Sequence, residues 1–121
     1  MSQKVRTHKD LEIWKKGIDL VTEVYKVTKQ YPKEEQYGLC SQMQRAAVSY
    51  TSNIAEGAAR SSVSEYVRYL YIAMGSLSEL ETQVIISVNL EYMDSGEDIL
   101  EHIEHLRRMT LNFIKYLKDK S

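Results

Sequence analysis

Apolar side chains recur at alternating spacings of three and four residues in four separate segments of this chain. Such spacing gathers the side chains on one face of an α-helix and is typical of helices that pack in bundles. We expect helices over about residues 10–31, 33–58, 62–92 and 96–118, because no segment shows the period of a strand pair. The sequence therefore predicts an all-α fold, an antiparallel up-down-up-down four-helix bundle that forms one domain over residues 1–121.

Breaking and capping residues mark the predicted helix ends. Pro32 disfavours the helical conformation at Tyr31, so the first helix ends there and the proline can occupy the first turn of the second. Ser62 has Glu65 three residues later, which is a capping box that begins the third helix. Ser95 is the predicted cap of the fourth helix.

The first helix carries more apolar surface than one core-facing seam requires. Its predicted seam consists of Leu11, Trp14, Ile18, Val21, Tyr25 and Thr28, whereas that of the second helix consists of Cys40, Met43, Ala47, Tyr50 and Ile54. A second apolar stripe with Gly17 in register lies beside the seam of the first helix. A wide core-facing stripe accounts for part of this surface. Two full stripes would leave an exposed patch, and such patches mark association, so the sequence predicts a homo-oligomer. The candidate subunit-interface residues are Ile13, Leu20, Val24, Val27 and Tyr31, with Tyr69 and Ile72 of the third helix.

Composition favours a soluble cytoplasmic protein. The single cysteine, Cys40, cannot form an internal disulfide, which suits a reducing compartment. The N-terminal residues lack the apolar segment of a secretion signal. The longest apolar run, "YLYIAM", is far shorter than the roughly 18 residues that a membrane span needs.

No pattern in the chain predicts an enzyme. His102 and His105 lie four residues after Asp98 and Glu101, but neither has the Glu-x-x-His spacing of di-metal bundles. We therefore expect solvated side-chain pairs there and neither a metal nor a cofactor. The five glycines are scattered singly, so there is no glycine-rich phosphate loop.

Two groups of small and polar residues lie inside the predicted second and third helices. The first is the stretch "NIAEG", in which Gly57 can end the helix as a cap. The second surrounds Gly75, whose cost of about 1 kcal/mol in a helix predicts a close helix crossing. We expect Ser49, Asn53 and Glu56 to form a polar network with the third helix, within or between subunits; ligand binding is the alternative. The full set is Asn53, Ile54, Ala55, Glu56, Gly57, Ala73, Gly75, Ser76 and Glu79, with Gln83 on the same face.

Four stretches together carry a family resemblance: "DLEIWKKGIDL", "YPKEEQYGLCSQMQRAAVS", "NIAEG" and "AMGSLSELETQ". Over about residues 8–118 the chain resembles the four-helix-bundle proteins encoded within intervening sequences of bacterial 23S ribosomal RNA genes. The resemblance implies a bundle that assembles into a homopentamer and makes "NIAEG" a family signature. A related branch, the accessory variability protein of diversity-generating retroelements, binds its reverse transcriptase and nucleic acid.

The charge distribution bears on nucleic acid as a partner, which the resemblance implies. The net charge of −1 leaves no broad nucleic-acid footprint, so contacts must come from a local patch. The candidate contacts are Lys4, Arg6, Lys9, Lys15 and Lys16, and the chain's other end adds Lys115, Lys118 and Lys120. We expect these two clusters at opposite ends of the subunit. Two functions stand: association with RNA, DNA or a nucleic-acid enzyme such as a reverse transcriptase, and a purely protein-binding scaffold.

Overall fold

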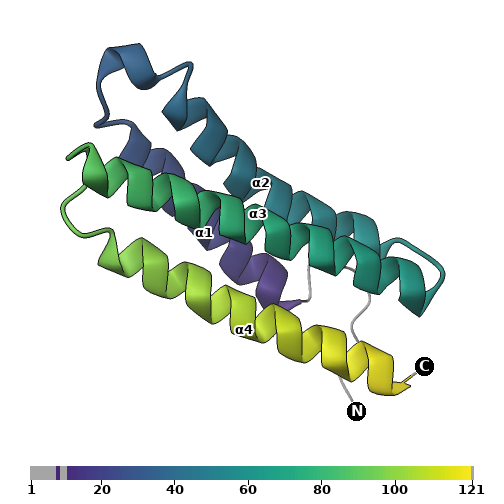
Figure 1. Ribbon diagram of the computed structural model, residues 1–121. Helices are drawn as coiled ribbons and strands as arrows, with labels where there is room; N and C mark the ends of the chain where they lie inside the picture. The colour runs from purple at the N-terminus through teal and green to yellow at the C-terminus, as the bar shows by residue number, and fades with distance from the viewer. Residues whose placement is uncertain (1–7, 9–10, 121) are drawn as a thin grey trace.

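Four α-helices pack side by side in a computed structural model that describes residue 8 and residues 11–120 (Figure 1). Each helix packs against the helix before and after it, and the first also packs against the last. No strand occurs in the described part of the chain, so the predicted all-α four-helix bundle is confirmed. The elements are α1 (Glu12–Thr28), a 3₁₀ turn η2 (Lys33–Glu35), α2 (Leu39–Ala58), α3 (Val63–Asn89) and α4 (Glu97–Lys120).

The helix ends follow local chemistry and depart from the predicted bounds at three places, the first being the end of α1, which lies at Thr28 rather than at residue 31. The Ser62 Oγ accepts the backbone N–H of Glu65 at 3.2 Å, which confirms the predicted cap of α3. The second helix begins at Leu39 rather than at residue 33, because Gly38 has a non-helical backbone with φ −112° and ψ −106°. The third helix ends at Asn89 rather than at residue 92, and Glu91 beyond it adopts a φ of +64°.

The core confirms the predicted seam of α2 and corrects that of α1. Cys40, Met43, Ala47, Tyr50 and Ile54 are all fully buried. On α1 the face turned to the core is the stripe that we predicted as a subunit interface, together with Leu11 and Thr28 of the predicted seam, while Ile18 and Tyr25 of that seam are exposed. The interface prediction is therefore wrong for four residues buried in the protomer, Ile13, Leu20, Val24 and Tyr31, while Val27 packs partly buried against the core and stays a prediction.

Gly17 explains why this stripe of α1 faces the core. A Cβ atom added at Gly17 would lie 2.7 Å from the Cγ2 of Thr51 and 2.9 Å from the Cε2 of Tyr50. Because glycine has no side chain, α1 approaches α2 closely enough to cover the Tyr50 ring. The glycine and its apolar neighbours on the same stripe must then face inward.

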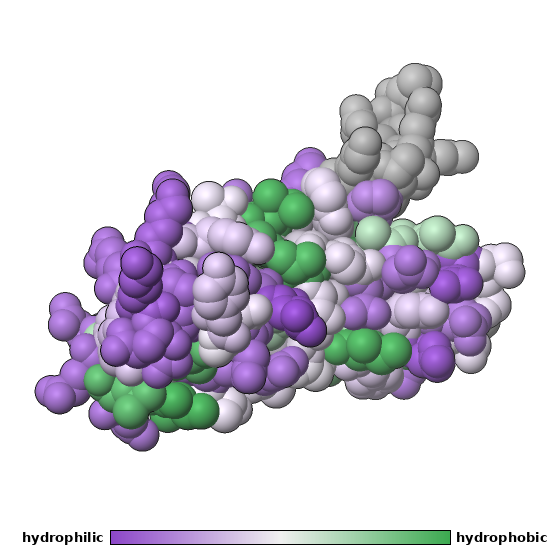
Figure 2. All heavy atoms as spheres, turned by 90° about the horizontal axis from the view of Figure 1, so that it is seen from above, coloured by the Kyte–Doolittle hydropathy of each residue, from purple (hydrophilic) through white to green (hydrophobic). Residues whose placement is uncertain are grey.

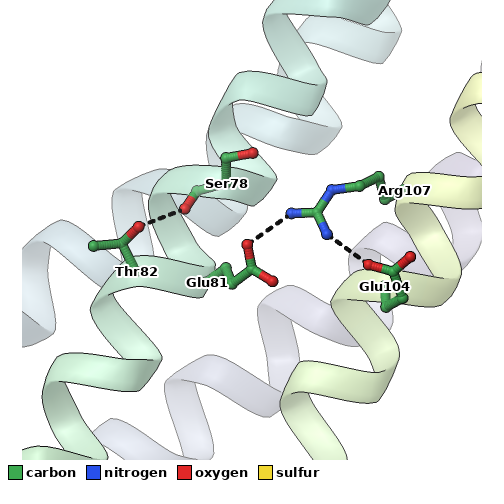
Figure 3. A network of polar contacts seen from close by, with 5 residues as sticks. All are labelled: Ser78, Glu81, Thr82, Glu104 and Arg107. Atoms are coloured by element: carbon green, nitrogen blue, oxygen red, sulfur yellow. Dashed lines mark hydrogen bonds and ion pairs between the residues drawn. The ribbon is translucent and has the colours of Figure 1, made fainter.

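Polar pairs on the bundle surface join α4 to its two neighbours. Figure 3 shows Arg107 of α4 donating to the Glu81 Oε1 of α3 at 3.0 Å and to the Glu104 Oε1 at 2.6 Å. On the other side, the His102 Nδ1 lies 3.0 Å from the Glu23 Oε1 of α1. We had expected His102 to pair with Asp98 along its own helix, but the carboxylate it contacts belongs to a different one.

Candidate nucleic-acid interface

Charge is segregated along the long axis of the bundle. We call residues 11–18, 53–72 and 108–120 the basic half, and residues 19–52 and 73–107 the acidic half. The basic half holds eight Lys or Arg against four Asp or Glu, a local net charge of +4. The acidic half holds five against twelve, a local −7. The eight cations are Lys15, Lys16, Arg60, Arg68, Arg108, Lys115, Lys118 and Lys120.

The described members of the two lysine clusters predicted to lie at opposite ends lie toward the same end: Lys15 and Lys16 of the first, and Lys115, Lys118 and Lys120 of the second. The start of α1, the α2–α3 connection and the end of α4 share one end of the bundle in Figure 1. The Lys118 Nζ of α4 lies 3.5 Å from the hydroxyl of Tyr71, in the first third of α3. The expectation was wrong because antiparallel neighbours place the start of one helix beside the end of the other.

Aromatic rings accompany these cations. Four cation–ring contacts occur in the described part of the chain, and all four lie in the basic half. Arg60 and Arg68 lie 4.9 and 5.3 Å from the ring centroid of Tyr69. The Nζ atoms of Lys118 and Lys120 lie 5.5 and 5.2 Å from the ring centroids of Tyr71 and Tyr116, respectively.

The rings differ in how accessible they are. Tyr66 packs edge-on against Phe113 at 5.6 Å, and burial raises the pKa of Tyr66 to about 12. Phe113 in turn stacks on Tyr116 at 6.2 Å. Tyr116 is 54% exposed and Tyr71 is 48% exposed. The inner rings therefore close the core, whereas Tyr71 and Tyr116 present ring surface to solvent.

The residues predicted to contact nucleic acid are partly placed by the structure. Lys15 is exposed near the start of α1, with its Nζ 3.8 Å from the Glu12 Oε1, and Lys16 is half-buried. Lys4, Arg6 and Lys9 lie outside the described residues. Sequence reasoning missed the arginines and tyrosines of the basic half. Their signal was the succession of Arg60, Tyr66, Arg68, Tyr69 and Tyr71 within twelve positions.

The "NIAEG" stretch serves the packing of α2 against α3. A Cβ atom at Gly57 would lie 2.9 Å from the Tyr69 Cβ and 3.2 Å from the backbone oxygen of Tyr66. Gly57 therefore marks a close helix crossing rather than only a helix end. Tyr69, one of the predicted interface residues, is partly buried beside it. Of the other signature residues, Ile54 and Ala73 are buried and Ala55 is half-buried.

The expected polar network between α2 and α3 is present in a smaller form. The Asn53 Nδ2 donates to the Ser49 carbonyl oxygen at 2.8 Å, and the Ser76 Oγ donates to the Ser49 Oγ at 2.9 Å. Glu56 does not join this network; its Oε2 accepts from Arg60 at 2.9 Å. Glu79 is exposed and makes no ion pair with the described residues. These contacts support a packing role for the signature.

Gly75 does not lie at a helix crossing within the protomer, so the prediction is wrong for the single chain. No atom lies within 4 Å of the position that a Cβ would take there. Gly75 lies on the exposed face of α3, together with Ile72, Ile86 and Leu90, which are between 41% and 49% exposed. Figure 2 shows one side of the bundle, where apolar residues form separate green areas on a largely polar surface.

Two other features are absent among residues 8 and 11–120. No group of three or more His, Cys, Asp or Glu side chains is placed to hold a metal ion there. Among the same residues no helix has both the length and the apolar content to cross a bilayer.

Comparison with known proteins shows the family. The family model described as 23S rRNA-intervening sequence protein matches residues 9–112. The chain belongs to this family. Its fold is also that of a crystal structure of a protein of unknown function, assigned to the S23 ribosomal protein family, from Bacteroides thetaiotaomicron VPI-5482. The two share 19% identity and a TM-score of 0.75 over 85% of this chain and 98% of that one. No curated protein matches the chain.

Proposed function

We propose that this member of the 23S rRNA-intervening sequence protein family is a non-enzymatic nucleic-acid-binding protein that holds phosphate groups on its basic half. The observation that carries the proposal is the separation of charge, +4 against −7, along one bundle. A net charge of −1 does not oppose binding when the acidic residues lie toward the far end. The family description names an rRNA, so RNA is the first probe.

Binding of this kind depends on salt. Each lysine or arginine that neutralises a phosphate releases a condensed counterion, so the affinity falls as salt rises. For about four phosphate contacts on a single strand or a duplex, the expected loss between 50 and 200 mM salt is on the order of a hundredfold. A purely protein-binding scaffold would show no such dependence on an RNA probe.

Fluorescence anisotropy with a labelled RNA tests the proposal. The test variant reverses four cations of the basic half: Lys15→Glu, Lys16→Glu, Lys115→Glu and Lys120→Glu. The matched control reverses four exposed cations of the acidic half: Lys26→Glu, Lys29→Glu, Lys33→Glu and Arg45→Glu. Both variants change the net charge by the same amount. We expect the first to abolish binding at low salt and the second to weaken it far less.

Equal losses in the two variants would show that only total charge matters and would contradict the proposal. If the unmodified protein does not bind RNA at low salt, the purely protein-binding scaffold becomes the better supported function. Circular dichroism of both variants shows that the helices are retained, which is expected because nearly all of the altered side chains are exposed.

The exposed face of α3 supports self-association as a second part of the function. Ile72, Gly75, Ile86 and Leu90 are all exposed on this helix, and a mid-helix glycine with open space above it lets a second helix approach closely. A ring of copies, five by the family resemblance, would repeat the basic half and strengthen weak phosphate contacts through avidity. Light scattering coupled to size exclusion measures this directly, since one chain has a mass of 14.1 kDa.

A further inference from the structure

The exposed tyrosines of the two halves have different surroundings. In the basic half Tyr71 and Tyr116 each have a lysine ammonium within 5.5 Å of the ring centroid. In the acidic half Tyr25 is 42% exposed and Tyr37 is 99% exposed, and no cation–ring contact involves either in the described part of the chain. Exposed rings combined with cations are therefore a property of the basic half.

We propose that the basic half binds single-stranded nucleic acid, with unpaired bases stacked on Tyr71 and Tyr116 and phosphates held by Lys118 and Lys120. This inference rests on the proposed function, whose site it shares. A nucleotide presents a flat π-face and an anionic phosphate, and each ring–lysine pair offers one partner for each. The two pairs lie on α3 and α4, so the strand would pass over both helices at this end.

Strand state decides whether such rings can be used. In a duplex each base face is covered by the neighbouring base pairs, and a protein meets phosphates and groove edges instead. Unpaired bases in loops and ends can be splayed out and stacked on aromatic side chains. Stacking tolerates any sequence because every base has a π-face. Lysines alone would bind both forms, whereas the tyrosines add affinity only for the single strand.

A purely structural use of these contacts is the alternative. A lysine over an exposed tyrosine ring also stabilises a folded protein modestly, without any ligand. The contacts of the Tyr69 ring are consistent with such a stabilising role for cations. Two arginines lie close to this ring, and Arg60 also donates to its hydroxyl at 2.8 Å. Tyr71 and Tyr116 differ because about half of the surface of each is exposed, whereas Tyr69 is partly buried, although the Lys118 Nζ also lies 3.5 Å from the Tyr71 hydroxyl.

Anisotropy titrations with two RNA probes of equal length distinguish base stacking on the tyrosines from a purely structural role of the cation–ring contacts. The probes are a labelled 20-nucleotide oligouridine and a blunt 20-base-pair RNA duplex, both at low salt. At 1–3 kcal/mol for each stacked base, we expect the single strand to bind at least about tenfold more tightly. The test variant combines Tyr71→Leu with Tyr116→Leu, and a ring-preserving variant combines Tyr71→Phe with Tyr116→Phe. The matched control combines Tyr25→Leu with Tyr37→Leu.

The leucine variant is expected to lose most of the single-strand preference while its duplex affinity stays unchanged. The phenylalanine variant and the acidic-half control should keep the preference. Equal affinity of the unmodified protein for both probes, or an unchanged preference in the leucine variant, would overturn this inference and leave the proposed function standing. Binding of neither probe would overturn both.

Discussion

The hydroxyl of Tyr50 on α2 lies 2.8 Å from the Oγ1 of Thr110 on α4, and both side chains are fully buried. Thr110 gives its own hydroxyl hydrogen to the Leu106 carbonyl oxygen at 2.7 Å, so Tyr50 is the donor of the pair. The bond joins two helices that are not neighbours in the bundle, and the Tyr50 ring therefore spans the core. Gly17 on α1 provides the space beside that ring.

Replacing Gly17 by alanine should destabilise the protein although alanine favours the helix. The added Cβ would lie 2.7 Å from the Thr51 Cγ2, and the buried Tyr50 ring beside it cannot move away. Overpacking of this kind costs about 1–3 kcal/mol. Gly75→Ala is the matched control, since its Cβ meets open space and should gain up to about 1 kcal/mol. Urea unfolding of both variants measures the difference, and a stabilised Gly17→Ala would contradict this packing.

Gly57→Ala tests the role assigned to "NIAEG". The new Cβ would contact the Tyr69 Cβ at 2.9 Å, an atom held by the α3 backbone. We expect a loss of about 1–3 kcal/mol in the free energy of unfolding. Ala58→Gly, one position further along α2, is a helix-propensity control and should cost no more than about 1 kcal/mol. A Gly57→Ala variant as stable as the parent would show that Gly57 only ends the helix.

The buried Tyr50 makes stability fall at alkaline pH. Burial raises the pKa of Tyr50 to about 12, above its ordinary value of 10.0. The unfolded chain therefore loses this proton at lower pH than the folded one. The stabilising effect is complete below pH 10 and is lost as pH rises toward 12, by about 1.4 kcal/mol at pH 11. Urea unfolding at pH 8 and at pH 11 measures the change.

Tyr50→Phe removes the ionisable group and should reduce the loss between those two pH values. At pH 8 the same variant should cost about 1 kcal/mol, because the hydrogen bond to Thr110 is gone. Tyr37→Phe is the control, since Tyr37 is 99% exposed and should leave the pH dependence unchanged. Parallel curves for the parent and Tyr50→Phe would exclude Tyr50 as the cause.

The exposed α3 face predicts where assembly can be broken. Ile72→Glu should lower the molar mass measured by light scattering toward 14.1 kDa, because it places a charge on the face that we propose for self-association. Gly75→Leu should do the same by blocking close approach, while the protomer remains folded. Ile18→Glu, on the exposed side of α1, is the control. A parent protein that stays monomeric at high concentration, or an Ile72→Glu variant of unchanged mass, would rule this face out.

The fold could be predicted from the sequence because every helix carries its own periodic pattern. The seam of α2 and the Ser62 cap of α3 are confirmed because they depend on residues close together in the chain. The orientation of α1 could not be predicted, since apolar residues occupy both of its stripes. Only the contact of Gly17 with Tyr50, thirty-three positions later, decides which stripe faces inward.

The candidate site was harder to predict than the fold, because it too depends on contacts between residues far apart in the chain. Gly75 and Gly57 are both helical glycines, but whether each meets a neighbouring helix depends on α2–α3 packing. The pairing of Tyr71 with Lys118 joins residues forty-seven positions apart, so neither stands out in its own segment. The basic half emerges only when the antiparallel order of the helices brings three chain segments together.

Lysine footprinting of the unmodified protein tests the central claim most directly. Each lysine's rate of acetylation is measured by mass spectrometry, at low salt, with and without a saturating single-stranded RNA. We expect protection of Lys15, Lys115 and Lys120 in the basic half, because bound phosphates shield their ammonium groups. Lys29 and Lys33 of the acidic half are controls in the same sample and should react at unchanged rates. Protection at Lys29 and Lys33, or equal rates at every lysine with and without RNA, would contradict nucleic-acid binding by the basic half.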